Sequence, residues 1–239
     1  MSHPTPLSVS TQGPVTVLQI TRPHRRNAID SSLLDALAAT LSDVERDDQV
    51  RAVVLTGDDQ AFSSGQDLKE PEPSDYLDRF NEVVGQLERL PKPTVAAVSG
   101  WCIAGGLEFA LGCDVRVASA ESTIGDFHAR INSIGGGGMT ARLPRTVGLS
   151  RAKKLMFTSE LLDAEEALRI GLVDAVHPVD AYLDAAIDLA GEAANHDPRT
   201  LAYAKQALHE GLELPLERAV ERSLELHRAL QDELADEPS

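Results

Sequence analysis

The sequence is poor in aromatic residues and cysteine. Aromatic side chains account for 4% of the 239 residues, so a buried core must consist mainly of Leu, Val, Ile and Ala. Two cysteines, Cys102 and Cys113, cannot form a disulfide framework or a cysteine-based metal site. Both lie among apolar residues, which predicts buried free thiols in a reducing compartment.

Long hydrophobic runs and targeting patterns are also missing. No apolar run approaches the ~20 residues that cross a bilayer, so no membrane span is expected. The start, MSHPTPLSVST, lacks the charged-then-apolar layout of a signal peptide. The end, ADEPS, is no peroxisomal tripeptide. We therefore expect a cytoplasmic protein.

Basic residues are scarce relative to acidic ones. The chain has 22 Lys and Arg against 38 Asp and Glu, and its net charge is −16. Nucleic acids and anionic membranes require a basic footprint, so neither is an expected partner. The seven histidines show no H-E-x-x-H or paired spacing, and no metal is expected.

Several catalytic and phosphate-binding motifs are absent as well. Neither G-x-G-x-x-G nor G-x-x-x-x-G-K-[ST] occurs, which disfavours a nucleotide-phosphate loop. A serine hydrolase would have to recruit Ser63 or Ser64 with His128 and Asp67, but G-x-S-x-G is missing. We therefore disfavour that class.

What is present is an alternation of strand and helix patterns. Residues 15–20 and 53–55 are predicted to form strands. Asp30 is predicted to cap the helix that follows it, in which apolar residues recur at helical spacing. Residues 74–90 form the next predicted helix, and further strands follow at 95–98 and 115–118. This order predicts an α/β fold. After residue 180 three helical patterns follow without a strand, so we divide the chain into a core, 1–180, and a C-terminal helical region, 181–239.

The segment SGWCIAGGLEFALGCD, residues 99–114, combines a strand end, two glycines and a helix start. The first amides of a helix have no internal partner and lie at the positive end of its dipole. Gly105 and Glu108 are three residues apart and share a helix face. A carbonyl bound by the Gly105 amide would lie close to the Glu108 carboxylate, as enolate chemistry requires. The alternative is an ordinary turn in which Glu108 is merely a favourable first-turn charge.

A second amide donor is expected in AFSSGQDLKE, residues 61–70, whose small, turn-prone composition suits a loop that lines a ligand site. An ordinary surface turn is the alternative there.

Taken together, these segments resemble the enoyl-CoA hydratase/isomerase (crotonase) superfamily. TRPHRRNAID is similar to its R-P-x-x-x-N-A segment, FSSGQDLKE to its F-x-x-G-x-D-L-K-E loop, and VSGWCIAGGLEFALGCDVRVAS to its glycine-pair and Glu segment. The resemblance continues to about residue 180. It implies a crotonase-like spiral of ββα repeats, a C-terminal helical trimerisation region, and a homotrimer or dimer of trimers.

The resemblance also implies site residues. The oxyanion amides fall on Gln66 and Gly105, and the catalytic carboxylate falls on Glu108. The ligand is an acyl-CoA thioester, so coenzyme A is part of the substrate and no separate cofactor is expected. Basic side chains such as those of Arg25 and Arg26 suit the phosphate groups of coenzyme A. The expected contacts to CoA and substrate are Arg25, Arg26, Ser64, Gln66, Asp67, Leu68, Lys69 and Gly105.

The sequence differs from the family pattern at the position where hydratases of the family commonly have a second glutamate. His128 stands there, within a D-F-H-A-R segment that resembles a subgroup of the family. Its ordinary pKa of roughly 6.5 permits proton transfer near neutral pH, and Glu108 beside it favours the protonated form. We predict that Glu108 activates water and that His128 donates the α-carbon proton or holds the water. The alternative is that His128 only fills the pocket wall.

The run Gly135 to Gly138 contains no acid. Acid-dependent dehalogenation and dienoyl isomerisation of this superfamily are therefore disfavoured, and we interpret the run as a roomy pocket edge. The resulting prediction is an enoyl-CoA hydratase-like lyase. Isomerisation, C–C hydrolysis or decarboxylation, and non-catalytic acyl-CoA binding, are the alternatives.

Overall fold

In the computed structural model, which describes residues 5–69 and 73–235, the strands form two sheets. The larger sheet contains, in spatial order, β1 (Leu7–Gln12), β2 (Val15–Ile20), β3 (Ala52–Thr56), β5 (Thr94–Val98), β7 (Val115–Ser119) and β10 (Ala175–His177). The smaller sheet contains β4 (Ala61–Ser63), β6 (Trp101–Ile103), β8 (Thr123–Gly125) and β9 (Leu161–Asp163). The β1–β2 and β8–β9 pairs are antiparallel, and all other pairs are parallel.

The order of elements repeats along the chain and produces a spiral. β3, β5 and β7 are neighbours in the larger sheet, and the strand that follows each of them, β4, β6 or β8, lies in the smaller sheet. A helix then leads to the next turn: α2 (Tyr76–Arg89), α3 (Gly105–Gly112), or the short η2 (His128–Ile131) followed by α4 (Met139–Val147). This is the predicted pattern of ββα repeats. The remaining helices are η1 (Pro23–Arg25), α1 (Ser31–Arg46), α5 (Leu149–Thr158), α6 (Ala164–Arg169), α7 (Tyr182–Ala194), α8 (Pro198–Gly211) and α9 (Leu216–Ala235).

Local signals in the sequence account for several element boundaries. The predicted strand 15–20 is β2, and the side chain of Asp30 accepts a 2.9 Å hydrogen bond from the Leu33 amide at the start of α1. Asp197 caps α8 in the same way, with Pro198 at the first helical position. The helix predicted over 74–90 extends from Tyr76 to Arg89.

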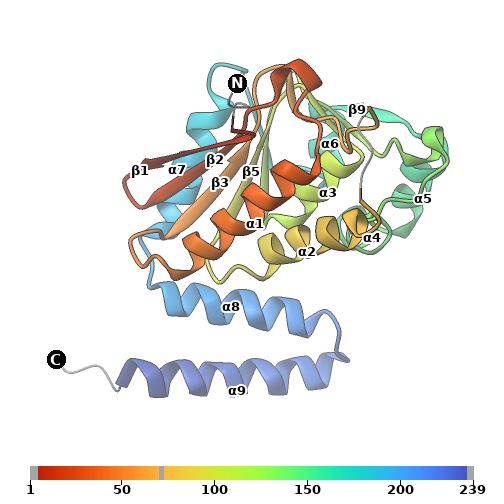
Figure 1. The fold of residues 1–239 in the computed structure, drawn as a ribbon. Coiled ribbons are helices and arrows are strands. Elements are labelled where there is room, and N and C mark those ends of the chain that lie inside the picture. Colours follow the sequence, from red (N-terminus) through yellow and green to blue (C-terminus); the bar gives the residue numbers. More distant parts are fainter. Residues whose placement is uncertain (1–4, 70–72, 236–239) are drawn as a thin grey trace.

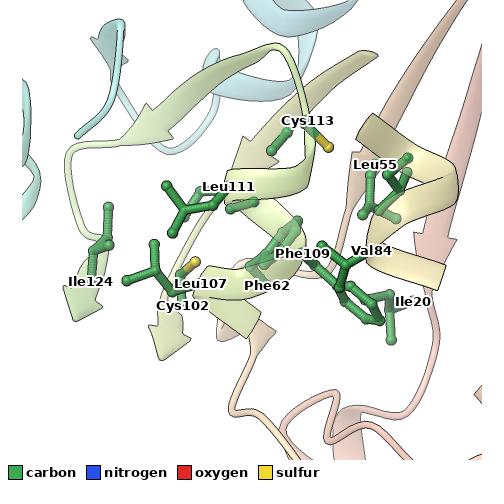
Figure 2. Packing of buried hydrophobic residues seen from close by; sticks show 14 of the residues in the cluster. Ile20, Leu55, Phe62, Val84, Cys102, Leu107, Phe109, Leu111, Cys113 and Ile124 are labelled. Atoms are coloured by element: carbon green, nitrogen blue, oxygen red, sulfur yellow. The ribbon is translucent and has the colours of Figure 1, made fainter. Parts of the chain in front are cut away.

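Hydrophobic side chains cover both faces of the larger sheet. On one face they pack against α1, α2 and α3, and every residue of α3 is buried. Figure 2 shows Leu107, Cys102 and Ile124 on one side of α3 and Phe109, Val84 and Ile20 on the other. Both cysteines are buried and free, as predicted. Because all residues of α3 are buried, the packing around the helix holds its N-terminus and Glu108 in place.

The C-terminal helices differ in how they contact the core. Helix α7 packs on the second face of the larger sheet through Tyr182, Ala186, Ile187 and Ala190. Helices α8 and α9 pack on one another and lie beside the core as a hairpin (Figure 1). Lys205 on α8 reaches Asp114 of the core at 2.8 Å. The predicted division at residue 180 stays a prediction. Within the described ranges, no helix is both long and apolar enough to span a bilayer.

Candidate active site

A cavity of about 540 Å³ opens between η1, the loop after β4, α3 and η2. Every site residue predicted from the sequence lines it: Arg25, Arg26, Ser64, Gln66, Asp67, Leu68, Lys69, Gly105, Glu108 and His128. Glu70, the last residue of the predicted ligand-lining loop, lies outside the described residues. The structure thus brings the whole predicted set to one cavity, while the role of each residue stays a prediction.

The backbone around Gln66 leaves its amide free of the neighbouring segment. Ile29 and Gln66 form a parallel bridge in which the Ile29 amide donates to Gly65 and the Asp67 amide donates to Ile29. In such a bridge the groups of Gln66 itself face away from Ile29. Gly65 has φ +87°, a conformation that favours glycine. The turn at Gly65 therefore directs the Gln66 amide to the side opposite Ile29.

The start of α3 lies directly against this loop. A Cβ placed on Gly65 would lie 3.1 Å from the amide nitrogen of Gly105 and 3.0 Å from Cβ of Ala104. Gly105 is the first residue of α3, where an amide has no partner within the helix. The two predicted oxyanion donors thus belong to segments in direct contact.

Ala104, which precedes α3, has a strained backbone. Its φ of 51° and ψ of −121° lie in a region that non-glycine residues seldom occupy. Such strain costs of order 1–3 kcal/mol and is concentrated at functional sites. The Ala104 amide donates to the carbonyl of Gly125 at 3.2 Å, which holds this turn at the end of β6. The two glycines in the sequence gave no sign that an alanine would adopt this conformation.

Glu108 is 1% exposed, and its two carboxylate oxygens have different surroundings. Oε1 accepts a 2.9 Å hydrogen bond from the Met139 amide at the start of α4. Oε2 is buried and has no hydrogen-bond partner among the described residues. Burial raises the pKa of Glu108 above its ordinary value, although the Met139 hydrogen bond and His128 oppose the shift. One oxygen is therefore anchored and the other is available for proton transfer.

His128 faces the available oxygen of Glu108. Its Nε2 lies 3.9 Å from Oε2 of Glu108, too far for a direct hydrogen bond. Burial lowers the pKa of His128, but the hydrogen bond and charge of Asp126, together with the charge of Glu108, outweigh burial and raise it. The protonated form predicted from the sequence is thus favoured by two carboxylates.

The glycine run is packed more tightly than predicted. A Cβ on Gly135 would lie 2.9 Å from Oε1 of Glu108 and 3.0 Å from Cε1 of His128. A Cβ on Gly137 would lie 2.5 Å from the Phe80 ring. Of the run, Gly136 lines the cavity. The run thus reaches the edge of the cavity at Gly136, as predicted, but the prediction that this edge is roomy is wrong, because the run lies against side chains of α2, α3 and η2.

The predicted CoA-binding residues lie around a buried ion cluster. Asp67 is 3% exposed, and its Oδ2 lies 3.2 Å from Nη2 of Arg22 and 3.8 Å from Nε of Arg25. Its Oδ1 accepts a hydrogen bond from the Lys69 amide. The Arg26 guanidinium lies 5.9 Å from the centre of the Trp101 ring. Asp67 thus anchors the loop that carries Gln66 and Lys69.

Sequence reasoning missed part of this site. Tyr76, Leu77 and Phe80 of α2 also line the cavity, although their helical spacing indicated only an ordinary helix. Asp126 contacts His128 and was noticed only as part of a motif. Its spacing, two residues before a histidine, was the available signal.

The comparisons with known proteins agree with this geometry. The sequence model of the enoyl-CoA hydratase/isomerase family matches residues 10–237. The chain belongs to this family. It is 35% identical over 216 residues to the short-chain-enoyl-CoA hydratase of Clostridium acetobutylicum, with 87% of this chain and 83% of that protein covered. It is 36% identical over 228 residues to the 2,3-dehydroadipyl-CoA hydratase of Escherichia coli, with coverage of 94% and 89%.

Solved structures place the fold in the same family. The crystal structure of the enoyl-CoA hydratase from Bacillus anthracis superimposes with a TM-score of 0.90 at 30% identity, covering 93% of this chain and 90% of that chain. The crotonase fold predicted from the sequence is therefore confirmed, and the chain is an enzyme of the enoyl-CoA hydratase/isomerase family.

Proposed function

We propose that the protein is an enoyl-CoA hydratase that adds water across the 2,3-double bond of an acyl-CoA thioester. The observation that carries the proposal is the approach of Nε2 of His128 to the unpartnered Oε2 of Glu108, beside the start of α3. An oxygen atom bound between these two groups would contact a proton acceptor and a proton donor at once.

In the proposed reaction the thioester oxygen accepts hydrogen bonds from the Gln66 and Gly105 amides, which stabilise the enolate as it forms. Glu108 removes a proton from water, and the water oxygen bonds to C3. His128 then donates its Nε2 proton to C2, which completes the addition. Finally Glu108 returns the proton it gained to His128, and the 3.9 Å separation of the two groups suits a transfer through one water. Atoms and charges balance over the cycle.

Coenzyme A enters the proposal as part of the substrate. The basic groups of η1 and the loop after β4, including Arg25, Arg26 and Lys69, line the same cavity as Glu108 and suit the CoA phosphates. No separate cofactor is required, because the substrate thioester itself stabilises the enolate.

We also propose a homotrimer or dimer of trimers in the cytoplasm. Helices α8 and α9, with the turn between them, expose apolar side chains that a lone hairpin does not bury: Leu208, Leu212, Leu216, Val220 and Leu224. Large exposed apolar patches mark interfaces between chains. Light scattering coupled to size-exclusion chromatography measures the assembly, and a monomer at micromolar concentration would contradict this part of the proposal.

The test is incubation with crotonyl-CoA and longer 2-enoyl-CoAs, followed by the enone absorbance and by mass spectrometry of the product. A gain of one water supports hydration. Loss of the conjugated enone without a change in mass indicates isomerisation, and fragmentation indicates C–C hydrolysis or decarboxylation. Binding without conversion of any substrate indicates an acyl-CoA-binding protein; all three of these outcomes contradict the proposal.

A further inference from the structure

Asp126 makes two contacts with His128 at the end of β8. Its Oδ1 accepts a 3.1 Å hydrogen bond from the His128 amide and lies within hydrogen-bond distance of the ring Nδ1. Asp126 is 1% exposed, and His128 is 7% exposed. The backbone amide and the ring of His128 thus both contact the same oxygen of Asp126, and both residues are buried. These contacts fix the orientation of the imidazole.

The contact at Nδ1 decides which ring nitrogen takes part in chemistry. A carboxylate beside Nδ1 holds a proton on that nitrogen, as carboxylates hydrogen-bonded to the far nitrogen of other functional histidines do. Nε2 is then the atom that can gain or lose a proton. It is also the atom that faces Oε2 of Glu108.

The charges around His128 are mainly acidic. Asp126 reaches it from the preceding loop and Glu108 from α3, and both carboxylates are buried. Helix α5 packs on η2, but its cations, Arg151, Lys153 and Lys154, are exposed to solvent. A buried carboxylate is costly unless an opposite charge accompanies it. The imidazolium of His128 supplies that charge.

We propose that Asp126 is a positioning residue that directs Nε2 of His128 towards Glu108 and places a negative charge against Nδ1, so that His128 enters the reaction as the proton donor. The inference rests on the proposed hydration for its kinetic consequences. The effect of Asp126 on the charge of His128 is a property of the protein without substrate, so it can be tested independently of the reaction.

Two variants separate charge from orientation. Asp126→Asn keeps an oxygen that can accept from Nδ1 and from the backbone but removes the negative charge. We expect kcat near pH 8 to fall about tenfold or more, KM to change little, and the alkaline limb of the kcat profile to move to lower pH. Activity recovers towards pH 6, where the ring is protonated again. Asp126→Ala also loses the orientation and stays impaired at both pH values.

Asp114→Asn is the matched control. Asp114 is a partly buried carboxylate paired with Lys205, and it does not line the cavity that contains Glu108. Its loss should leave the pH profile unchanged. Circular dichroism and thermal unfolding verify that each variant is folded.

A second readout needs no turnover. Nitrogen-15 NMR of the histidine rings, with His128→Gln to assign the signal, gives the tautomer and the pKa of His128. In the wild type we expect Nδ1 to carry a proton and the pKa to be raised, and in Asp126→Asn we expect the pKa to fall. An unchanged His128 titration in Asp126→Asn overturns the inference. A protein that lacks hydratase activity but shows the expected titration contradicts the proposed function alone.

Discussion

The amide of Met139 holds Oε1 of Glu108 at 2.9 Å and thereby connects the start of α4 to the buried helix α3. This hydrogen bond fixes the carboxylate so that Oε2 faces Nε2 of His128. The catalytic geometry we propose therefore depends on two helix starts, one of which supplies the carboxylate while the other orients it.

Replacing Glu108 by Gln should abolish proton transfer and preserve the fold. We expect kcat for crotonyl-CoA to fall about 10²- to 10⁴-fold, because general acid–base groups typically contribute that much. Affinity for a saturated acyl-CoA, measured by calorimetry, should change little. The exposed Glu121→Gln is the matched control. Turnover of Glu108→Gln within threefold of wild type would remove Glu108 from the mechanism.

The same variant should be more stable than wild type at alkaline pH. Burial raises the pKa of Glu108 above its ordinary value of 4.5. At pH values between the pKa of Glu108 in the unfolded chain and its higher pKa in the folded chain, the unfolded chain has released the proton and the folded chain retains it. The free energy of unfolding therefore decreases as the pH rises through this range. Glu108→Gln avoids this loss. Near pH 8 its Tm should exceed that of wild type by about 2–4 °C for each kcal/mol gained. The difference in Tm between Glu108→Gln and wild type should become smaller near pH 4. A Tm of Glu108→Gln below that of wild type at both pH values would contradict the expectation.

Gly135→Ala should disturb the proposed catalytic pair, Glu108 and His128. Its φ of +79° strains an alanine, and the added methyl group would press on Glu108 and His128. Gly148→Ala is the control, since Gly148 has φ +82° and nothing within 4 Å of its Cβ position. Both variants should lose about 1 kcal/mol or more of stability through backbone strain. Only Gly135→Ala should also lose kcat, by about tenfold or more. Equal kcat values in the two variants would mean that the run has no effect on the site.

The apolar part of the cavity lining predicts a preference for uncharged acyl chains. Tyr76, Leu77, Phe80 and Ile131 belong to this part, and we propose that they surround the acyl chain and form the acyl end of the cavity. The cations Arg25, Arg26 and Lys69 belong to the segments that we assign to CoA. A carboxylate buried there lacks a partner, because His128 already faces Asp126 and Glu108. We expect kcat/KM for crotonyl-CoA to exceed that for 2,3-dehydroadipyl-CoA by about 100-fold or more. Comparable values would show that a cation reaches the acyl end.

The parts of the fold that follow from local chemistry were predictable. The Asp30 cap and the apolar spacing after it specify α1, and enrichment in Val and Ile indicates β2. Strands of three residues, such as β4 and β6, carry too few residues for a periodic signal. They exist because they pair with one another across turns of the spiral.

The site was predictable where one segment contains both partners. Gly105 and Glu108 share a helix turn, so their proximity follows from sequence spacing. The tight packing of Gly135 against Glu108 and of Gly137 against Phe80 involves residues distant in sequence, and no local pattern encodes it. The strained backbone of Ala104 lies directly after the last residue of β6 that pairs with β8, a distant segment, and no local pattern encodes it either.

Successive turns of the spiral each contribute one wall of the cavity, since its lining comes from η1, the loop after β4, α3 and the segment after β8. No single turn of the spiral therefore supplies the whole lining of the cavity, and a bound ligand would contact several turns at once. Occupancy should raise the midpoint of thermal unfolding in proportion to the logarithm of ligand concentration. A melting curve thus becomes a means of finding the natural acyl chain.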